Sequence, residues 1–594
     1  MASWQRTHTC GALSAAQAGT SVVLCGWVEN WRHHGGIVFL DLRDRYGVTQ
    51  IVFDVERKSA ESGLFERAQA LRSEDVISVR GAVHLRVGDQ VNTKRATGQV
   101  EIYVDSLTVL NKAETTPFEI IDDLDANDEL RLTYRYLDLR RRPMMRALEK
   151  RATFVTSVRN YLAKHGFVDI ETPILTKSTP EGARDYLVPS RVHPGEFYAL
   201  PQSPQLFKQL MMVAGLDRYY QIARCFRDED LRADRQPEFT QIDLEMSFVE
   251  ENDVMDLVEG MVVHTFAEGL DITVPSPFPR MDYMEAIARF GSDKPDLRFA
   301  MELIDVGAVA KKSEFKVFRG AVDAGGAVKG LCVQGAAEKF SRKEIDELTA
   351  FVGGYGAKGL AWAKVTPDGV TGSIAKFFEG EKGKELCAAM AAKPGDLLLF
   401  VADKASVVHK ALGELRLKVG GILGLRTPGV FKFAWVTNFP MFEWSEERNQ
   451  WVFAHNPFSA PVDWDINDFT TDTANIRSRA YDIVMNGWEL GSGSIRIHRP
   501  ALQAKVFDFL GISKEQQAAN FGFMLDAYRY GAPPHGGIAL GVDRLVTLAV
   551  GATSIRDVVA FPKTATATCL MTKAPSAVST AQLDELGIRL SKPT

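Results

Sequence analysis

The chain has 594 residues, which is too long for one hydrophobic core and predicts about three or four domains. Hydrophobic residues make up 45% and charged residues 25%, as in ordinary globular proteins, so a disordered or fibrous chain is excluded. The formal net charge of −6 excludes indiscriminate coating of nucleic acid, but it allows a nucleic-acid partner held by local basic patches.

The cysteines and the N-terminal residues indicate a reducing, cytoplasmic compartment. The six cysteines are scattered and form no C-x-x-C pair, so the sequence predicts neither a zinc knuckle nor a disulfide framework. The first residues, MASWQRTHTCGAL, lack the apolar core of a signal peptide, and no apolar run is long enough to span a bilayer. We therefore expect a cytoplasmic protein with no membrane partner.

Residues 1–110 are rich in β-forming residues, with glycine and charged turns between the runs. Such a pattern suits a small Greek-key barrel of the OB-fold type, which binds single-stranded nucleic acid on its strand face. Phe39 and Gln50 offer a stacking ring and a base-reading amide on such a face. A barrel with an ordinary surface explains the same residues equally well. The expected strands lie at residues 21–31, 36–44, 47–54, 75–83 and 99–110.

Residues 111–135 form a polar connector, expected to act as a hinge, and an amphipathic helix follows Pro143. The arginines at 140–142 could line a path for backbone phosphates. A solvated helix start is the more common explanation for such a run.

Residues 166–250 hold a dense cluster of polar motifs. Pro173 ends a predicted strand, and because proline lacks a ladder donor it favours a sheet edge or an interface. The segment TKSTPEGARDY suits a loop that closes over a ligand. Ser203, Gln205 and Lys208 follow near a predicted helix start.

Residues 224–245 predict a strand, a long charged loop and a returning strand. Arg227 and Glu229 lie where the first strand ends, two residues apart and so on one face. The Arg fork suits a phosphate, and the carboxylate suits a base or an amine. The alternative is a solvated, ion-paired hairpin tip.

Residues 286–420 alternate helical and strand patterns with few clustered polar residues, and we interpret them as an inserted α+β domain without chemistry of its own.

In the next region, 421–563, an Asn-Gly turn joins two predicted strands. Asp482 and Glu489 flank that turn and could share Mg²⁺ with phosphates, or they could be solvated. A glycine-rich segment then leads to Arg544 and an apolar helix; it matches neither a P-loop nor a Rossmann motif.

Together these motifs resemble the bacterial class II aspartyl-tRNA synthetases over essentially the whole chain. The first class motif lies around Pro173, FRDE of the second at 226–229, and GVDR of the third at 541–544. The stretches TPEGARDY, QSPQLFKQ, DLRADRQPEFTQID, GSGSIRIH and GAPPHGG are similar to this subgroup, and GSDKPDLRF to its inserted domain.

The resemblance implies an α+β multidomain fold and a homodimer built largely through the first motif. An N-terminal OB-fold anticodon-binding domain would precede a catalytic domain with a six-stranded antiparallel sheet flanked by helices. The catalytic domain would comprise residues 136–285 and 421–563, interrupted by the inserted domain, with a C-terminal extension at 564–594.

The resemblance also implies ATP and L-aspartate as substrates, Mg²⁺ as cofactor and tRNA(Asp) as partner. Aspartate would attack the α-phosphate of ATP to give aspartyl-adenylate, and the 3′ end of the tRNA would then take the aspartyl group.

The site residues that the resemblance implies can be grouped by the ligand that each would bind. Arg227 and Arg544 would be catalytic, and Asp482 and Glu489 would hold Mg²⁺. The implied aspartate-binding residues are Glu181, Ser203, Gln205, Lys208, Arg227, Asp243, His455 and Arg496. The implied ATP-binding residues are Arg227, Asp228, Glu229, Gln236, Phe239, Glu489, Gly541, Val542, Asp543 and Arg544.

Individual roles follow the family. Lys208 and Arg496 would clamp the side-chain carboxylate of aspartate, and Asp243 with its neighbours would surround the ammonium. Glu229 would read the adenine amine, and Phe239 and Arg544 would lie on opposite faces of adenine.

Two departures concern specificity. Asn456 stands where the family often has a second histidine, and its role stays undecided. His34 stands where members strict for tRNA(Asp) often carry Leu, and Asp89 lies at the other linked position. His34 and Asp89, together with Phe39 and Gln50, form the implied anticodon site. Positions 34 and 89 favour a ligase that also charges tRNA(Asn) over one strict for tRNA(Asp).

Two rival functions remain. An asparaginyl or lysyl ligase shares the layout, but Lys208 and Arg496 favour aspartate. A silent RNA-binding paralogue would be expected to lose Arg227, Glu229, Glu489 or Arg544, and all four are present.

Overall fold

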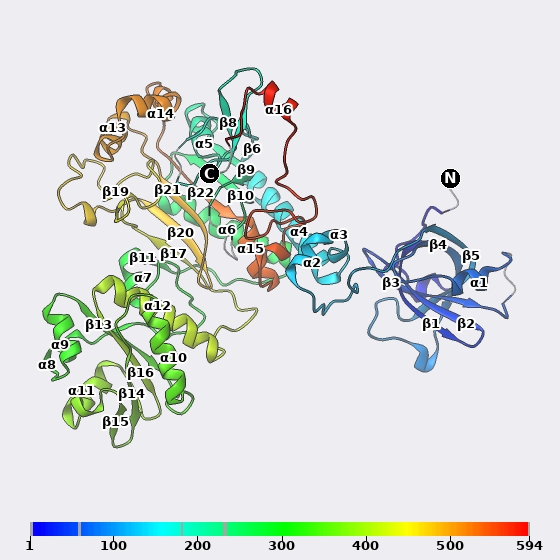
Figure 1. The fold of residues 1–594 in the computed structure, drawn as a ribbon, viewed down its shortest axis with the longest axis horizontal. Coiled ribbons are helices and arrows are strands. Elements are labelled where there is room, and N and C mark those ends of the chain that lie inside the picture. The colour runs from blue at the N-terminus through cyan, green and yellow to red at the C-terminus, as the bar shows by residue number, and fades with distance from the viewer. Residues whose placement is uncertain (1–3, 58–60, 180–181, 230–234, 592–594) are drawn as a thin grey trace. The chain divides into compact units, whose positions relative to one another are not determined.

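The computed structural model describes residues 4–57, 61–179, 182–229 and 235–591 (Figure 1). They separate into two compact units. One comprises residues 1–148, 560–564 and 568–575, and the other comprises 149–559, 565–567 and 576–594.

The first unit is built on a closed barrel with the strand order β1-β2-β3-β5-β4 (Figure 1). Buried side chains such as Leu24, Val38, Ile51 and Ile102 alternate along the strands and fill its interior. The OB-fold prediction is confirmed, and each expected strand is present. The strands are β1 (Ser21–His34), β2 (Ile37–Asp44), β3 (Gly47–Asp54), β4 (Val76–Leu85) and β5 (Val100–Asn111), with helix α1 at Leu64–Gln69.

The predicted connector is not wholly irregular. It contains α2 (Asp128–Thr133), and α3 (Arg135–Asp138) follows. Asn127 begins α2 by accepting a hydrogen bond from the backbone N–H of Leu130. The sequence pattern does not reveal this helix because its six residues make less than two turns, too short to show a period.

The arginines at 140–142 are ion-paired within their own unit. Arg140 lies 2.7 Å from Glu74, Arg141 2.7 Å from Asp138, and Arg142 3.3 Å from Glu29. These pairs favour the structural explanation of the run over a phosphate path.

The second unit contains an eight-stranded sheet in the order β11-β17-β20-β21-β22-β10-β9-β6 (Figure 1). The six strands from β17 to β9 are antiparallel, as predicted, while β11 and β6 add to the two edges in parallel. The strands are β6 (Val168–Asp169), β9 (Arg218–Phe226), β10 (Glu238–Ser247), β11 (Arg280–Asp282), β17 (Phe433–Thr437), β20 (Ala480–Met485), β21 (Trp488–Ile495) and β22 (His535–Gly541).

The predicted Asn-Gly turn joins β20 to β21. Asn486 and Gly487 have positive φ angles of 55° and 87°, the pattern of a tight hairpin turn. Pro173 follows the edge strand β6, which ends at Asp169, so the strand is shorter than predicted.

Helices and two short ribbons surround this sheet. Phe154 of α4 packs edge-on against Phe266 of α6, with ring centroids 6.3 Å apart. The helices are α4 (Arg142–Lys164), α5 (Gln205–Val213), α6 (Glu251–Leu270), α7 (Tyr283–Phe290), α13 (Pro500–Phe509), α14 (Lys514–Tyr528), α15 (Val542–Val550) and α16 (Thr580–Glu585). The ribbons pair β7 (Leu187–Pro189) with β8 (Phe197–Ala199) and β18 (Phe442–Ser445) with β19 (Gln450–Phe453).

The inserted region forms its own antiparallel sheet in the order β12-β13-β16-β14-β15, with helices around it (Figure 1). Two groups of buried apolar side chains, one including Leu399 and Leu412 and the other Phe318 and Phe400, form its core. The elements are β12 (Ile304–Asp305), α8 (Gly307–Lys312), α9 (Lys316–Asp323), β13 (Ala327–Val333), α10 (Arg342–Gly353), β14 (Ala361–Thr366), β15 (Gly369–Gly372), α11 (Glu381–Ala389), β16 (Leu397–Asp403) and α12 (Ala405–Ile422).

Among the described residues, no helix has both the length and the apolar character that a bilayer crossing needs.

Candidate active site

A cavity of about 390 Å³ opens on the face of the large sheet, over β10, β21 and β22. This volume is typical of small-ligand sites. Most of the predicted site residues line it together: Ser203, Gln205, Lys208, Arg227, Glu229, Gln236, Phe239, Asp243, His455, Glu489, Arg496, Gly541, Asp543 and Arg544.

The remaining predicted residues lie elsewhere. Asp228, Val542 and Asp482 are outside the cavity lining. Val542 is fully buried, and Asp228 forms an isolated backbone bridge with Arg184. Glu181, and most of the loop that follows Glu229, are outside the described residues.

Strand β10 supplies the floor. Phe239, Gln241 and Asp243 all line the cavity, because successive odd-numbered residues of a strand point to the same face. Opposite Asp243 and Gln241 on the neighbouring strand β22 stand Ala539 and Gly541. Small residues there leave room for a ligand above β10.

A buried cluster of four charges borders one end of the cavity, and three of its members, Lys208, Asp243 and Arg496, line it. Lys208 Nζ lies 2.7 Å from Asp243 Oδ1 and 3.3 Å from Glu245 Oε2. The Arg496 guanidinium grips Glu245 with two hydrogen bonds of 2.9 and 3.1 Å. All four residues are at most 2% exposed. The two cations are therefore balanced by two carboxylates of the protein itself.

Burial raises the pKa of both carboxylates, but the neighbouring cations offset this effect to different extents. Burial raises the pKa of Asp243, and Lys208 offsets only part of that effect. For Glu245 burial also favours protonation, but Arg496 and Lys208 together outweigh it and hold the pKa below its usual range. Asp243 Oδ2 has no hydrogen-bond partner among the described residues although it is buried. A buried orphan carboxylate oxygen is an acceptor site for an ammonium.

Glu245 does not line the cavity, but it pairs with Lys208 and Arg496, which do, and the sequence did not single it out. The available signal was its position, two residues after Asp243 and hence on the same strand face. Gly537 faces it on β22: a Cβ there would lie 2.1 Å from Glu245 Oε2, so only glycine fits. Gln202, Arg235 and Gln241 line the cavity and were not predicted.

A neutral network lies behind the charges. Gln209 donates through Nε2 to the hydroxyl of Tyr528 at 2.8 Å, and the same nitrogen lies 3.1 Å from His535 Nε2. The other ring nitrogen of His535 lies 2.8 Å from the carbonyl of Pro533, and since a carbonyl only accepts, this nitrogen carries the proton. Burial lowers the pKa of His535, so the ring stays neutral at pH 7.

The other end of the cavity carries Arg227, Glu229 and Arg544. The Arg227 guanidinium lies 5.0 Å from the centroid of the Phe239 ring. Glu229 pairs with Arg235 at 3.0 Å, and Arg544 donates to the carbonyl of Glu489 at 2.9 Å. This end thus offers two guanidinium groups and an aromatic face, which suit a nucleotide.

Asp543 has structural contacts. One carboxylate oxygen lies 2.5 Å from Arg151 of α4, and the other accepts from the backbone N–H of Thr240 at 3.0 Å. These bonds tie the start of α15 to β10, and so fix Arg544 beside the cavity.

Asp482 lies beneath the cavity wall. It is paired across strands with Ser492, which lines the cavity. Burial and the negative charge of Glu489 raise the pKa of Asp482 well above its ordinary value, and Ser492 opposes this with a hydrogen bond. Asp482 Oδ1 is buried without a partner among the described residues. A divalent cation beside Asp482 and Glu489 would satisfy that oxygen, so the donor set fits Mg²⁺.

Two carboxylates alone do not make a complete metal site. Among the described residues, no group of three or more His, Cys, Asp or Glu side chains could hold a metal ion. A cation here would need further oxygen ligands from a substrate or water, as is usual for Mg²⁺.

His455 and Asn456 have different surroundings. His455 Nδ1 lies 3.1 Å from Ser492 Oγ, and its ring packs edge-on against Phe439. Burial lowers the pKa of His455, which favours the neutral ring. The Asn456 side-chain oxygen accepts from the backbone N–H of Phe458 at 3.0 Å and from Ser459 Oγ at 3.3 Å. Asn456 therefore shapes the turn that carries its neighbour His455.

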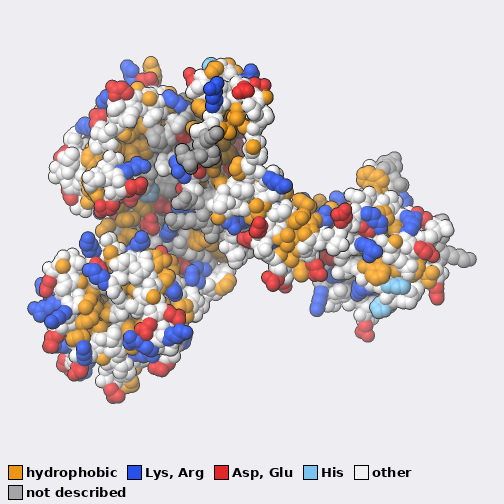
Figure 2. All heavy atoms as spheres, viewed as in Figure 1, with side chains coloured by type: hydrophobic (Ala, Val, Ile, Leu, Met, Phe, Trp, Pro, Cys, Tyr) orange, Lys and Arg blue, Asp and Glu red, His pale blue; other side chains and the backbone are white. Residues whose placement is uncertain are grey.

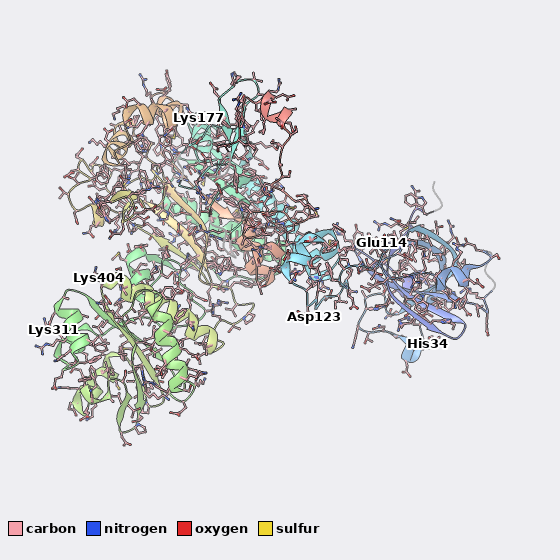
Figure 3. All side chains as sticks on the ribbon, viewed as in Figure 1. His34, Glu114, Asp123, Lys177, Lys311 and Lys404 are labelled. Atoms are coloured by element: carbon pink, nitrogen blue, oxygen red, sulfur yellow. The ribbon has the colours of Figure 1, made fainter. Side chains whose placement is uncertain are left out.

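The predicted anticodon residues lie on the barrel, in the other unit. Phe39 is paired across strands with Arg32, and Gln50 with Asp41, so the four share one face. Gln50 accepts from Arg32 at 3.2 Å and donates to Glu101 at 2.9 Å. His34, labelled in Figure 3, ends β1, and Asp89 lies in a short 3-10 helix at Gly88–Gln90; both are exposed.

Family models match both units. A model described as tRNA synthetases class II (D, K and N) matches residues 127–565, and one described as OB-fold nucleic acid binding domain matches residues 22–110.

Curated relatives are similar over nearly the full length. The chain is 54% identical over 589 residues to an aspartate–tRNA(Asp/Asn) ligase of Anoxybacillus flavithermus, covering 98% of each chain. It is 54% identical over 586 residues to an aspartate–tRNA ligase of Macrococcus caseolyticus, covering 99% of this chain and 98% of the relative.

Solved structures share the fold. The asparaginyl-tRNA synthetase of Pyrococcus horikoshii aligns with a TM-score of 0.57 at 19% identity, covering 94% of this chain and 98% of that one. A putative aspartyl-tRNA synthetase of Leishmania major aligns with a TM-score of 0.58 at 17% identity, covering 94% of each chain. With the cavity on an antiparallel sheet and the OB-fold barrel, these findings show that the chain belongs to the class II tRNA synthetases of the D, K and N group.

Proposed function

We propose that this synthetase is an aspartate–tRNA ligase. The carboxylate of L-aspartate attacks the α-phosphate of ATP, giving aspartyl-adenylate and pyrophosphate. The 3′-hydroxyl of the terminal adenosine of tRNA(Asp) then takes the aspartyl group. The names of the relatives and the chemistry of the cavity both support this assignment.

The buried charge cluster is the observation that carries the proposal. Asp243 Oδ2 is an unpartnered acceptor for the substrate ammonium, and Lys208 and Arg496 beside it are donors for a side-chain carboxylate. Asparagine would turn an amide NH₂ donor toward groups that can only donate. Sites of this kind discriminate by about 10⁴–10⁵ at best, because the rejected analogue leaves buried polar groups unpaired. A lysine substrate would place a third cation there.

Activation then depends on positioning and charge. Arg227 holds the α-phosphate and orients the attacking carboxylate, Phe239 stacks on adenine, and Arg544 covers its other face. In-line displacement at phosphorus needs such groups more than a protein nucleophile. Asp482 and Glu489 would hold Mg²⁺, which when bound neutralises charge on the triphosphate.

The barrel face binds the anticodon in this proposal. Phe39 supplies a stacking ring and Gln50 a base-reading amide, on a face that also carries Arg32. The residues at positions 34 and 89 lead us to propose tRNA(Asn) as a second substrate. Charging assays with separate tRNA(Asp) and tRNA(Asn) transcripts test this part, and charging of tRNA(Asp) alone would end it.

We also propose a homodimer formed around the first motif, acting in the cytoplasm as translation requires. Val168, Ile174 and Leu175 near Pro173 are 43%, 41% and 53% exposed, an apolar surface that a second copy would cover. Light scattering should give twice the 65.7 kDa chain mass, and a monomer at micromolar concentration would contradict the dimer.

Pyrophosphate exchange into ATP tests the central activity. We expect exchange that depends on aspartate and not on asparagine or lysine, and that is abolished by Arg227→Ala without loss of fold. Exchange driven by asparagine or lysine instead would replace the substrate assignment. No exchange with any of them, at saturating ATP and Mg²⁺, would favour a silent RNA-binding paralogue.

A further inference from the structure

A chain of hydrogen bonds behind the cavity ends on Gln205, one of the residues that line it. Gln205 is the first residue of α5, and Gln209 follows one helical turn later on the same face. The side-chain nitrogen of Gln205 donates to the side-chain oxygen of Gln209 at 3.2 Å. Gln209 in turn contacts Tyr528 and His535, which lie outside the cavity lining. The function proposed above gives Gln209, Tyr528 and His535 no role.

The bonds at the far end of this chain each have one direction. The carbonyl of Pro533 only accepts, so Nδ1 of His535 carries the proton, and Nε2 of the neutral ring only accepts. Because Nε2 of His535 lies 3.1 Å from the Gln209 amide, the NH₂ group of Gln209 is the part that faces the ring. The second hydrogen of that NH₂ group goes to the hydroxyl of Tyr528 at 2.8 Å.

The direction carries through to the cavity. Since both hydrogens of the Gln209 NH₂ group are used, the Gln209 oxygen faces Gln205 and accepts from the NH₂ group of Gln205. The amide oxygen of Gln205 has no hydrogen-bond partner among the described residues. It is therefore the part of this amide that is left as an acceptor for a ligand in the cavity.

Burial prevents the chain from reversing. Gln209 and His535 are 0% exposed, and Tyr528 is 3% exposed. Figure 2 shows basic and acidic side chains interspersed over the inserted domain, and at such a surface water replaces a lost partner. Inside the protein, a reversed amide would set two NH groups, or two lone pairs, against each other and leave both unsatisfied.

We propose that Gln209 and His535 are positioning residues that turn the amide oxygen of Gln205, and not its NH₂ group, toward the ammonium of the substrate. Gln205 lies one turn before Lys208 on α5, and Lys208 contacts Asp243 at 2.7 Å. An ammonium only donates, so the Gln205 oxygen and the unpartnered Oδ2 of Asp243 give it two acceptors. A reversed amide would place an NH₂ group against the ammonium instead. The inference rests on the aspartate ligase proposed above.

The test uses succinate, which is aspartate without its amino group and so separates the ammonium contact from all others. Pyrophosphate exchange gives KM for aspartate and for ATP, and competition with aspartate gives the inhibition constant of succinate. In Gln209→Met we expect KM for aspartate to rise roughly tenfold, since a hydrogen bond to a charged group is lost. The inhibition constant of succinate and KM for ATP should stay within about twofold, because neither ligand uses this contact.

Gln517→Met and Tyr528→Phe are the control variants. Gln517 is 4% exposed and lies on α14, outside both the hydrogen-bond chain and the cavity lining, so its substitution also removes a buried amide. Tyr528→Phe removes one acceptor, but His535 still sets the direction of Gln209. Both variants should keep KM for aspartate within about twofold of the unsubstituted value. A Tyr528→Phe variant with the raised KM of Gln209→Met would show that packing, and not the direction of the amide, is responsible.

Gln205→Met should raise KM for aspartate as Gln209→Met does. Adding Gln209→Met to it should raise KM no further, because both substitutions remove the same contact. If Gln209→Met does not fold, Gln205→Met with succinate still decides. Equal weakening of aspartate and succinate, or additive effects of the two substitutions, would overturn this inference alone. An unsubstituted protein without aspartate-dependent exchange would overturn the proposed function as well.

Discussion

The charge cluster at the amino-acid end of the cavity and the carboxylate pair Asp482 and Glu489 are in different electrostatic states. At the amino-acid end, Lys208 and Arg496 already hold Glu245 and Asp243, so both cations have partners before any substrate arrives. In the carboxylate pair, Asp482 is buried beside Glu489, with an oxygen that has no partner among the described residues and with a raised pKa. The amino-acid end is therefore assembled by the fold itself, whereas in the proposed function a bound cation completes the carboxylate pair. Substitutions in the charge cluster should therefore lower both stability and activity, whereas substitutions in the carboxylate pair should lower activity alone.

The largest effect should come from the assembled end. Glu245→Gln removes the partner that Arg496 and Lys208 share, and leaves buried charge uncompensated. We expect a loss of about 3–5 kcal/mol in the free energy of unfolding, together with loss of aspartate-dependent exchange. Chemical denaturation measures the free energy of unfolding, and pyrophosphate exchange into ATP measures the activity. A variant with unchanged stability would show that the cluster is not a balanced unit.

Asp482→Asn should give the opposite combination. It replaces a carboxylate that the fold disfavours, so stability should be unchanged or raised, while exchange falls by roughly 10²–10³-fold. Thermal unfolding and exchange at saturating Mg²⁺ check this. Stability lost in proportion to activity would mean that Asp482 is a structural residue.

Gly537→Ala probes the packing of the assembled end. The new Cβ would lie 2.1 Å from Glu245 Oε2 and displace it from Arg496. We expect about 1–3 kcal/mol of destabilisation from overpacking, and a raised KM for aspartate. Gly522→Ala is the control, because a Cβ there meets no atom within 4 Å other than its chain neighbours and the backbone of its own helix α14. Since alanine favours a helix over glycine, the stability of this control should be unchanged or slightly raised. A Gly537→Ala variant with the control's behaviour would argue against the tight fit.

The smallest expected effect is a pH dependence. The folded-state pKa of Asp482 is raised, so the folded state binds a proton more tightly than the unfolded chain does. Its contribution to stability is therefore favourable below the ordinary carboxyl pKa of 3.8 and is lost as pH rises through the raised folded value. Asp482→Asn should gain in melting temperature over the unsubstituted protein as pH rises from about 4. A difference that is flat with pH would contradict the raised pKa.

Much of the fold follows from local sequence. The barrel strands, the Asn-Gly hairpin and the helix after Pro143 are governed by period and turn chemistry, which are visible residue by residue. The parallel edge strands β11 and β6 are only three and two residues long, and their pairing partners are distant in sequence. No local pattern marks such pairings.

The residues of the candidate site also fall into those that local motifs reveal and those that depend on distant partners. Most of the residues carried over from the family motifs line one cavity. Glu245 could not be singled out from the sequence, because its partner Arg496 lies 251 positions later in the chain. The inserted domain was predicted to lack chemistry, since its own residues form no motif.

Aspartate binding without nucleotide tests the central claim most directly. If the fold preassembles the amino-acid end, isothermal titration calorimetry should detect L-aspartate binding in the absence of ATP and Mg²⁺. L-asparagine should bind far more weakly, and Asp243→Asn should abolish the aspartate signal. Equal binding of the two amino acids, or aspartate binding that requires ATP and Mg²⁺, would contradict the account.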